Sequence, residues 1–350
     1  MQNVGKNVWV GLSGGVDSAV SAALLKEQGY DVTGVFIKIW SPEFLECTWR
    51  EDRLDAMRVA VHLDIPFLEV DLSEEYKDSV IANMLHEYEA GRTPNPDVLC
   101  NETIKFGAFA KWAFKNGAEI LATGHYVRVE TRESVAHLLK GIDPAKDQTY
   151  FLYRMPKAVI EKTIFPVGGF TKKQIREKAL SLRLPNAERP DSQGLCFVGD
   201  VSMQEFLSRF IALKKGVLVN ESSEHIGEHD GAMLYTIGQR HGFRLLPIAG
   251  DGPYYVIGID TKKNIVRVSR NVAVSKHAGA MLSDIHWINE PLDEDMLTAA
   301  PRYHAKEVPV KIVGNKVYFA EPVQLTPGQS LVFYRGEECL GGGIIHTVEV

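Results

Sequence analysis

The sequence predicts an α/β protein with a doubly wound, mainly parallel sheet, followed by a small central β-rich domain and a C-terminal β-barrel. In the N-terminal part, short β-branched runs alternate with segments of helical spacing, as in repeated βαβ units. After Gly216, helical spacing gives way to short alternating runs separated by turns, which is typical of a barrel or sandwich. The chain has 350 residues, of which 45% are hydrophobic, so it can bury more than one core. We place the domains at residues 1–205, 206–272 and 273–350.

The net charge, the cysteine spacing and the apolar runs of the sequence argue against several classes of protein. A formal net charge of −6 argues against a protein covered in positive charge, although it allows a local basic face. The four cysteines, Cys47, Cys100, Cys196 and Cys339, are far apart and form no C-x-x-C pair, so we expect no metal site. Without a signal peptide or a long apolar run, we expect a cytoplasmic protein that does not bind membranes.

The most informative stretch follows the first predicted strand, Val8-Trp9-Val10. It precedes a predicted helix over 19–28 that Gly29 closes. We call it the glycine-rich loop, and it consists of Gly11, Leu12, Ser13, Gly14, Gly15, Val16, Asp17 and Ser18. A strand, a glycine turn and a helix in this order aim free backbone N–H groups at an anion. The loop has neither the lysine of a Walker-type P-loop nor the G-x-G-x-x-G of a dinucleotide site.

Within this loop the side chains have separate expected roles. Ser13 and Ser18 can donate hydroxyl hydrogen bonds to a phosphate. Asp17 would repel a phosphate, so we expect it to hold the loop or a Mg²⁺ ion. A plain glycine turn remains the alternative for the whole stretch.

The remaining elements of the first domain follow in order. Periodicity predicts strands at 32–39, 65–72 and 119–123, a hairpin at 127–140, and helices at 51–63, 73–89, 102–115, 171–184 and 203–213. Ligands bind at the carboxyl ends of parallel strands, so the glycine-rich loop and Thr123-Gly124-His125 should be neighbours in space. The basic helix over 171–184 is assigned mainly to a solvated face.

Two further loops carry isolated cysteines. Residues 92–101 contain Pro94 and Pro96, which predict a stiff loop that ends where a helix begins. Cys100 would then lie at a helix N-terminus, where a thiolate is stabilised, and Asp97 is close enough to act as a base. The alternative is a rigid turn with a buried cysteine. Glycines flank Cys196 within residues 191–199, which suggests an accessible thiol.

The sequence pattern of the C-terminal half predicts β-structure. We expect strands at 254–260, 265–268, 308–313, 316–319, 330–334 and 341–348, and a short helical insert that begins at 293–295. Residues 235–242 and 301–304 combine cations with aromatic rings, a chemistry suited to phosphate contact and base stacking. Ordinary strand ends are the alternative.

Together these motifs resemble the tRNA-specific 2-thiouridylases of bacteria, which belong to the PP-loop ATP pyrophosphatases with the adenine nucleotide alpha-hydrolase-like fold. The resemblance covers nearly the whole chain in the family's order. The residues that carry it are 11–18, 93–97 with Cys100 and Asn101, 122–126, 146–152, 191–197, 235–242, Arg302 with Tyr303, and 327–329. One departure is that Ile37 and Ile39 stand where the family often has Met and Asn.

The resemblance implies ATP-dependent adenylation of O2 of the wobble uridine, position 34 of the tRNAs for Lys, Glu and Gln, followed by sulfur transfer. ATP would bind the glycine-rich loop with Ile37 and Gly124 near the nucleotide, and Mg²⁺ would bind transiently with ATP. Cys196 would carry a persulfide from a sulfur carrier protein or cysteine desulfurase. Its terminal sulfur would reach C2 directly, or after Cys100 attacks the persulfide, and the two cysteines would end as a disulfide. Asp97 would be the general base.

The resemblance also implies which residues hold the RNA. The target base would lie among Asn95, Pro96 and Asp97. The tRNA would be held by His125, Lys146, Asp147, Gln148, Arg302, Tyr303 and Gln329. Cys47 and Cys339 are expected to be ordinary thiols.

Three competing hypotheses remain at this point. One is an amide-forming ATP pyrophosphatase, such as an argininosuccinate, GMP or NAD synthetase, which would not need Cys100 and Cys196. Another is an iron–sulfur tRNA thiolase, which would show clustered cysteines. The third is an RNA-binding module with a vestigial nucleotide fold, which would bind tRNA without consuming ATP.

Overall fold

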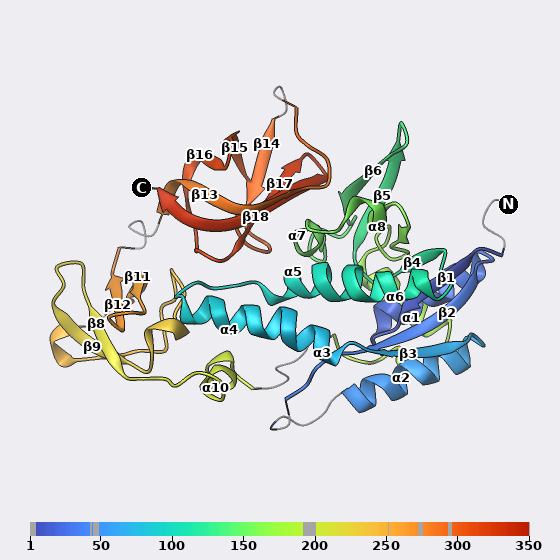
Figure 1. Ribbon diagram of the computed structural model, residues 1–350, viewed down its shortest axis with the longest axis horizontal. Helices are drawn as coiled ribbons and strands as arrows, with labels where there is room; N and C mark the ends of the chain where they lie inside the picture. Colours follow the sequence, from blue (N-terminus) through green and yellow to red (C-terminus); the bar gives the residue numbers. More distant parts are fainter. Residues whose placement is uncertain are drawn as a thin grey trace.

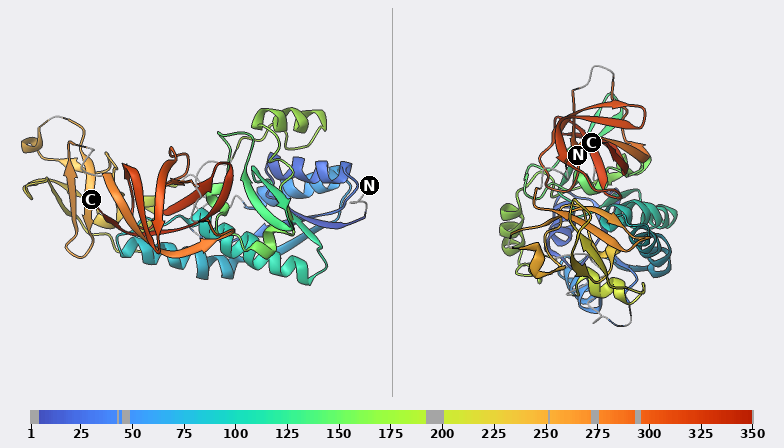
Figure 2. Two further views of the ribbon diagram at one scale, coloured as in Figure 1. Left: turned by 90° about the horizontal axis from the view of Figure 1, so that it is seen from above. Right: turned by 90° about the vertical axis from the view of Figure 1, so that its left-hand side faces the viewer.

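The computed structural model describes residues 5–42, 44, 49–191, 201–250, 252–271, 276–292 and 296–349. Three β-sheets are arranged along the long axis (Figure 1). The sheet with the N-terminus lies at one end, the sheet formed within residues 216–269 lies at the other, and the barrel formed within residues 276–349 lies between them against a row of helices. The view from above in Figure 2 shows the same order. In the described part of the chain, no helix is both long and apolar enough to span a bilayer.

The first sheet has the order β3-β2-β1-β4-β7, and all of its pairings are parallel. Its strands are β1 (Asn7–Gly11), β2 (Asp31–Lys38), β3 (Phe67–Asp71), β4 (Ile120–Ala122) and β7 (Thr163–Ile164). The reversal of strand order at β1 puts the carboxyl ends of β1 and β4 side by side. Such a switch point is where ligands bind in doubly wound sheets.

Helices cover both faces of this sheet because neighbouring residues of a strand point to opposite sides. Val8 and Val10 belong to one apolar cluster, and Trp9 between them belongs to another. The first cluster includes side chains of α1 (Val16–Glu27), α2 (Trp49–His62) and α9 (Lys172–Ser181). The second includes side chains of α3 (Ser73–Tyr76), η1 (Lys77–Ile81), α4 (Ala82–Glu89), η2 (Asn101–Phe109), α6 (Ala110–Lys115) and α10 (Met203–Ser208). The predicted doubly wound architecture is therefore confirmed.

The central sheet has the order β10-β9-β8-β12-β11. Its strands are β8 (Gly216–Val219), β9 (His225–His229), β10 (Arg244–Leu245), β11 (Tyr255–Asp260) and β12 (Ile265–Ser269), with two short 3₁₀ turns, η3 (Ala232–Leu234) and η4 (Pro247–Ala249). Only β8 and β12 pair in parallel within this sheet of described residues.

The C-terminal strands form a closed antiparallel barrel. They are β13 (Lys276–Trp287), β14 (Leu297–Ala300), β15 (Val308–Val313), β16 (Lys316–Gln324), β17 (Ser330–Arg335) and β18 (Glu338–Glu349). The order β13-β16-β15-β14-β17-β18 closes through a pairing of β13 with β18. A hairpin from the N-terminal part, β5 (Val127–Arg132) and β6 (Val135–Lys140), joins the same sheet through β6 and β18.

Most predicted elements appear in the structure, with some differences. The sequence patterns did not predict β7, β8, β9, β10, β13 and β14, or the short helices α7 (Thr149–Leu152) and α8 (Lys157–Ile160). They also did not predict α5 (Pro96–Cys100). Residues 293–295, predicted to begin a helical insert, lie outside the described residues, and β14 begins at Leu297. The domain boundaries near 205 and 272 stay predictions.

Candidate active site

The glycine-rich loop connects β1 to α1 in a conformation that requires glycine. Gly14 has φ of +79°, a left-handed conformation. A Cβ atom built there would lie 2.5 Å from the carbonyl oxygen of Asp52. Behind the loop, the Asn186 side chain donates a hydrogen bond of 2.7 Å to the Gly14 carbonyl oxygen. The backbone of the loop is therefore fixed at Gly14 by its contacts with Asp52 and Asn186.

Hydroxyl groups order the front of the loop. The Ser13 and Ser18 hydroxyls lie 3.2 Å apart, and the Gly15 N–H donates to the Ser13 hydroxyl oxygen at 3.3 Å. Gly15 is the N-cap of α1, and it provides no side-chain cap for the first N–H groups of that helix. The first N–H groups of any helix have no intrahelical partner. The N-terminus of α1 is therefore suited to an anionic ligand.

The end of β4 lies against this loop. A Cβ atom at Gly124 would come within 2.7 Å of the Ser18 amide nitrogen and 2.8 Å of the Asp17 carbonyl carbon. Only glycine fits at this contact. On the other side, a Cβ atom at Gly11 would lie 3.9 Å from Cδ1 of Ile37. The predicted proximity of the loop and residues 123–125 is confirmed, and Ile37 lies near the end of β1.

Asp17 is held by two neighbours from distant segments. The Tyr126 hydroxyl donates to its Oδ1 at 2.7 Å, and the Lys172 ammonium donates to Oδ1 at 2.7 Å and Oδ2 at 2.9 Å. Burial and the charge of Asp17 raise the pKa of Tyr126 far above its ordinary value, so this phenol stays a donor. Asp17 therefore links the glycine-rich loop to the segment between β4 and β5 and to α9, which agrees with the expectation that it holds the loop.

A second carboxylate, that of Asp191, forms ion pairs with three basic side chains. Lys172 lies 2.8 Å and Lys146 2.9 Å from its oxygens, and Arg176 donates to the same group. Burial alone would raise the pKa of Asp191, but the hydrogen bonds and charges of Lys172 and Lys146 hold that pKa well below its ordinary value. Asp191 stays ionised and links α9 to the loop that contains Lys146.

The assignment of the basic helix to a solvated face is wrong for part of α9. The Lys172 side chain is only 16% exposed, whereas the adjacent Lys173 is 87% exposed. The physical reason is that Lys172 finds its partners, Asp17 and Asp191, on other segments. A capping box between Thr171 and Gln174 sets the start of the helix and so directs Lys172 inward.

The predicted loop over residues 92–101 is also wrong in its second half, because a helix begins at Pro96. The Asn95 side chain caps this helix by accepting from the Val98 N–H at 3.3 Å. Proline at the first helical position loses no hydrogen bond and has a suitable φ, so it starts the helix rather than preventing it. Cys100 is then the fifth helical residue, beyond the reach of the N-terminal dipole, and it is 8% exposed.

Asp97 and His125 lie within electrostatic reach of one cation. Burial raises the pKa of Asp97, and the charge of Lys105 partly opposes that rise. Burial, and then the same Lys105 charge, lower the pKa of His125 well below its ordinary value. The His125 ring packs near Phe106 and shares a hydrogen bond of 2.7 Å with the Thr123 hydroxyl. This brings the end of β4 and the start of α5 into one neighbourhood.

The barrel braces the segment before α5. The Gln329 side-chain amide donates to the carbonyl oxygens of Thr93 at 2.8 Å and Pro94 at 3.1 Å. The Thr93 N–H donates to the Pro327 carbonyl oxygen, and its hydroxyl lies 3.0 Å from that of Thr236 in the central domain. One short segment therefore contacts all three parts of the molecule.

Some of the residues predicted to hold tRNA already make hydrogen bonds or ring contacts within the protein, and others are exposed. Asp147 accepts from Gly141 and Thr149, and Gln148 accepts from the Tyr126 N–H. Tyr303 packs on Phe151 with ring centroids 4.4 Å apart, and Arg302 is exposed. The contacts of Lys146, His125 and Gln329 are described above. Their contact with tRNA stays a prediction.

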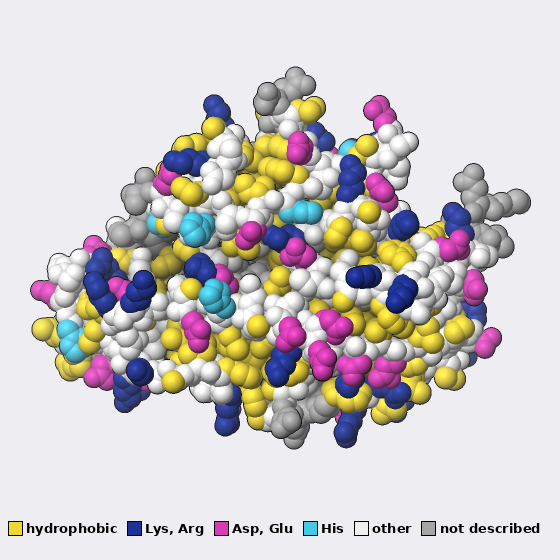
Figure 3. All heavy atoms as spheres, viewed as in Figure 1, with side chains coloured by type: hydrophobic (Ala, Val, Ile, Leu, Met, Phe, Trp, Pro, Cys, Tyr) yellow, Lys and Arg dark blue, Asp and Glu magenta, His cyan; other side chains and the backbone are white. Residues whose placement is uncertain are grey.

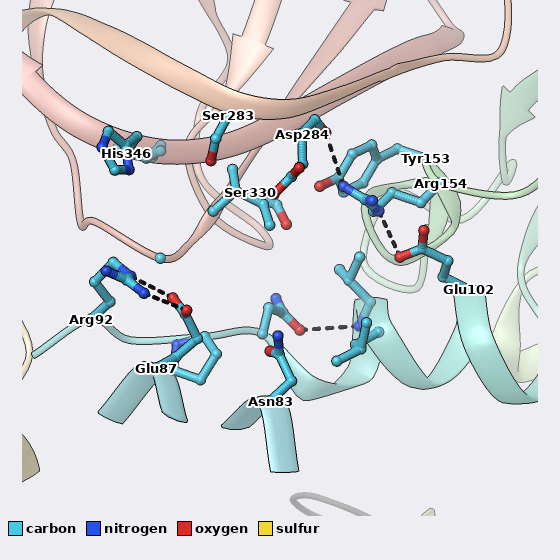
Figure 4. Close-up of a pocket in the computed structure, with 17 residues that line it drawn as sticks. Asn83, Glu87, Arg92, Glu102, Tyr153, Arg154, Ser283, Asp284, Ser330 and His346 are labelled. Atoms are coloured by element: carbon cyan, nitrogen blue, oxygen red, sulfur yellow. Dashed lines mark hydrogen bonds and ion pairs between the residues drawn. The ribbon is translucent and has the colours of Figure 1, made fainter. Parts of the chain in front are cut away.

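A cavity of about 290 Å³ lies between α4, α5 and the barrel (Figure 4). Its wall carries two ion pairs, Arg92 with Glu87 and Arg154 with Glu102. Asn95 also lines it, whereas Asp97 and Cys100 are not among the described lining residues. Because residues two and five positions after Asn95 fall on the other side of a helix, the cavity and the predicted catalytic groups occupy different faces of α5.

The other predicted cysteines and charges can be placed only in part. Cys196 and Cys47 lie outside the described residues, so the approach of Cys196 to Cys100 stays a prediction. Cys339 is fully buried, and burial raises the pKa of its thiol, as expected for an ordinary structural cysteine. On the face drawn in Figure 3, acidic and basic side chains are interspersed with apolar ones. Among the described residues, no group of three or more His, Cys, Asp or Glu side chains is arranged to hold a metal ion.

Sequence reasoning missed three residues that shape this site: Tyr126, Lys172 and Arg189. Arg189 donates to the Gly14 carbonyl oxygen and pairs with Asp52 and Asp55 of α2. Local patterns carry no signal for these contacts, because Gly14 is 175 positions from Arg189 and Asp17 is 155 positions from Lys172.

Comparison with known proteins identifies the family. Family models match residues 6–200 ("tRNA methyl transferase HUP domain"), 204–270 ("tRNA methyl transferase PRC-barrel domain") and 278–345 ("Aminomethyltransferase beta-barrel domain"). The tRNA-specific 2-thiouridylase MnmA of Enterococcus faecalis is 46% identical over 97% of this chain and 94% of its own length. The corresponding protein of Streptococcus thermophilus is 46% identical over the same shares, and MnmA 2 of Geobacillus kaustophilus is 44% identical over 97% and 95%.

The chain belongs to the tRNA-specific 2-thiouridylase family. The predicted resemblance is therefore confirmed. Among solved structures, the U34-tRNA thiolase NcsA from Methanococcus maripaludis matches 59% of this chain and 63% of its own, at 19% identity and a TM-score of 0.36. That likeness is too weak to support an inference about a 2-thiouridylase.

Proposed function

We propose that the chain is an ATP-dependent tRNA 2-thiouridylase that converts the uridine at position 34 to 2-thiouridine in the tRNAs for Lys, Glu and Gln. The observation that carries this proposal is the S-G-G-V-D-S loop at the switch point of the sheet, in a chain that matches a 2-thiouridylase over 97% of its length. The family models are described as methyltransferase domains, but an uncapped helix N-terminus behind a glycine loop suits a polyphosphate better than a methyl donor.

ATP is proposed to bind with its phosphates on the glycine-rich loop and its nucleoside between Ile37 and Gly124. The N–H groups at the start of α1 and the hydroxyls of Ser13 and Ser18 then face the phosphates. A Mg²⁺ ion that enters with ATP would supply neutralising charge, and Asp17 is the carboxylate of the loop that could hold it. The uridine O2 attacks the α-phosphorus, and pyrophosphate leaves. The urea-type oxygen thereby gains AMP as a good leaving group.

Sulfur transfer is proposed to use Asp97, Cys100 and Cys196. The raised pKa of Asp97 makes its carboxylate a better proton acceptor at neutral pH, which suits a general base. The terminal sulfur of a Cys196 persulfide attacks C2, the Cys100 thiolate then attacks Sγ of Cys196, and AMP leaves as the C2–S bond becomes a thiocarbonyl. Alternatively, Cys100 attacks first and releases sulfide, which attacks C2. Both routes end in a disulfide between the two cysteines.

The partners follow from this chemistry. The tRNA is proposed to contact His125, Lys146, Asp147, Gln148, Arg302, Tyr303 and Gln329, with the target base near Asn95, Pro96 and Asp97. The wobble base lies in an unpaired loop, so moving it into a pocket costs only a few kcal/mol of stacking. A sulfur carrier protein or cysteine desulfurase would supply the persulfide in the cytoplasm, where thiols stay reduced.

Mass spectrometry of tRNA nucleosides tests the proposal. Unmodified tRNA is incubated with the protein, ATP, Mg²⁺ and a persulfide donor. We expect 2-thiouridine and stoichiometric AMP, and we expect both to be lost in Cys100→Ser and Cys196→Ser but kept in Cys47→Ser. Recovery of intact unmodified tRNA would overturn the proposal. ATP consumption that forms AMP without 2-thiouridine, unchanged in both cysteine variants, would favour an amide-forming ATP pyrophosphatase instead.

A further inference from the structure

The glycine-rich loop contains no lysine, yet the proposed reaction expels pyrophosphate. Walker-type loops place a lysine of their own beside the β- and γ-phosphates. Fixed positive charge aimed at a leaving group is one of the largest contributions to phosphoryl-transfer catalysis. A loop without such a lysine needs a cation from another segment of the chain.

Among the described residues, four cationic side chains contact the loop or its ion-pair partners, and three of them have other contacts to make. Arg189 pairs with Asp52 and Asp55 behind Gly14. Arg176 donates to the carbonyl oxygens of Ala187 and Arg189 as well as to Asp191. Lys146 contacts Asp191 at 2.9 Å and is 40% exposed.

Lys172 is the cation that contacts a side chain of the loop itself. Its ammonium lies 2.7 Å from Oδ1 of Asp17, the second residue of α1, and 2.8 Å from Oδ1 of Asp191. Because α9 is capped at Thr171 and the side chain is 16% exposed, the ammonium is held in place. An ammonium has three N–H donors, so a phosphate oxygen can replace one carboxylate while the other still holds it.

We propose that Lys172 binds the β- and γ-phosphates of ATP and neutralises the departing pyrophosphate, as the loop lysine does in Walker-type sites. This inference rests on the proposed use of ATP. The ion pair with Asp17 keeps the ammonium next to the N-terminus of α1 until the nucleotide arrives. Asp191 then keeps it there while Asp17 is released.

The test compares the affinities of ATP and AMP, measured by equilibrium dialysis without tRNA. AMP lacks the β- and γ-phosphates, so a lysine that binds them affects ATP alone. In Lys172→Met we expect ATP affinity to fall about 10- to 100-fold, as for the loss of a charged hydrogen bond, with AMP affinity nearly unchanged. Lys172→Arg should restore part of the preference for ATP. Lys173→Met, next to it on the exposed face, should match the wild type.

A second comparison controls for misfolding. It is needed because Lys172→Met leaves the Asp17 carboxylate without its paired cation, which can destabilise the protein. The double variant Asp17→Asn, Lys172→Met removes both charges and is compared with Asp17→Asn alone; we expect the double variant to lose the preference for ATP. Equal losses of ATP and AMP affinity, or no loss, would overturn the role of Lys172. If the wild type binds no ATP at all, the proposed function fails instead.

Discussion

Two regions of the candidate site each contain an aspartate, and the surroundings shift the pKa of these two aspartates in opposite directions. Beside the glycine-rich loop, Asp191 contacts Lys146, Lys172 and Arg176, and its pKa lies well below the ordinary value. At the start of α5, burial raises the pKa of Asp97, and the Lys105 charge opposes that rise only in part. The first arrangement gives a permanent anion that positions cations. The second gives a carboxyl group suited to exchange a proton.

The two regions also differ in what fixes the backbone. Glycines that tolerate close approach and charged side chains from distant segments hold the glycine-rich loop. Neutral hydrogen bonds from the barrel, chiefly those of Gln329, hold the segment before α5. This difference indicates that one region is built for phosphate charge and the other for a neutral base. The following predictions test it.

The largest effect is expected from Asp97→Asn. Loss of a general base should slow thiolation by about 10²- to 10⁴-fold, while ATP affinity stays unchanged. Rates of 2-thiouridine formation and dialysis with ATP measure the two quantities. Thiolation at the wild-type rate would remove Asp97 from the chemistry and end the contrast with Asp191.

The next effect is expected from Gly124→Ala. The added Cβ would meet the Ser18 nitrogen and the Asp17 carbonyl carbon at 2.7 and 2.8 Å, so the loop must shift. A displacement of this kind costs about 100-fold in AMP formation. Gly169→Ala is the control, because nothing lies within 4 Å of a Cβ there. Equal activity of the two variants would show that the loop tolerates movement.

A smaller effect is expected from Gln329→Ala. It removes two hydrogen bonds to the Thr93 and Pro94 carbonyl oxygens, which together amount to about 1–2 kcal/mol, or roughly tenfold. The loss should appear in the KM for tRNA and leave ATP affinity alone. Gln204→Ala, on the exposed side of α10, serves as control. An ATP defect in Gln329→Ala would contradict the separation of the two regions.

The smallest effect is a pH-dependent change in the free energy of unfolding. The folded pKa of Asp191 is lowered, so its ion pairs stabilise the protein fully above the ordinary value of 3.8, and this stabilisation is lost gradually as pH falls from 3.8 towards the lower folded pKa. Asp191→Asn should therefore cost about 1 kcal/mol at pH 7 and less at pH 3. The folded pKa of Asp97 is raised, so ionising it destabilises the protein as pH rises, and Asp97→Asn should stabilise it at pH 7. Denaturant titrations at both pH values measure this, and the same sign for both variants would refute it.

How far the sequence predicts the molecule depends on the range of the interactions involved. The βαβ order and the neighbouring ends of β1 and β4 follow from local periodicity and from the rules of parallel sheets. β13 was missed because register shifts along its 12 residues disturb the alternating pattern. The pairing of β6 with β18 joins segments about 200 positions apart, which no local pattern encodes.

The same distinction applies to the candidate site. The glycine-rich loop was recognisable because its chemistry lies within eight consecutive residues. The start of α5 differs from the prediction because two prolines within three residues favour a stiff loop, whereas Asn95 and Pro96 together form a helix start. Lys172 was assigned to solvent because its two carboxylate partners come from the glycine-rich loop and from the end of the 186–191 segment.

The most direct test of the account follows the oxygen atom that the reaction replaces. The tRNA is prepared with ¹⁸O at O2 of uridine 34 and converted with ATP and a persulfide donor, and the released AMP is analysed by mass spectrometry. Because O2 attacks the α-phosphorus and leaves with AMP, we predict one ¹⁸O atom in each AMP formed with a 2-thiouridine. AMP without the label, formed in step with 2-thiouridine, would show that the uridine is never adenylated and would contradict the account.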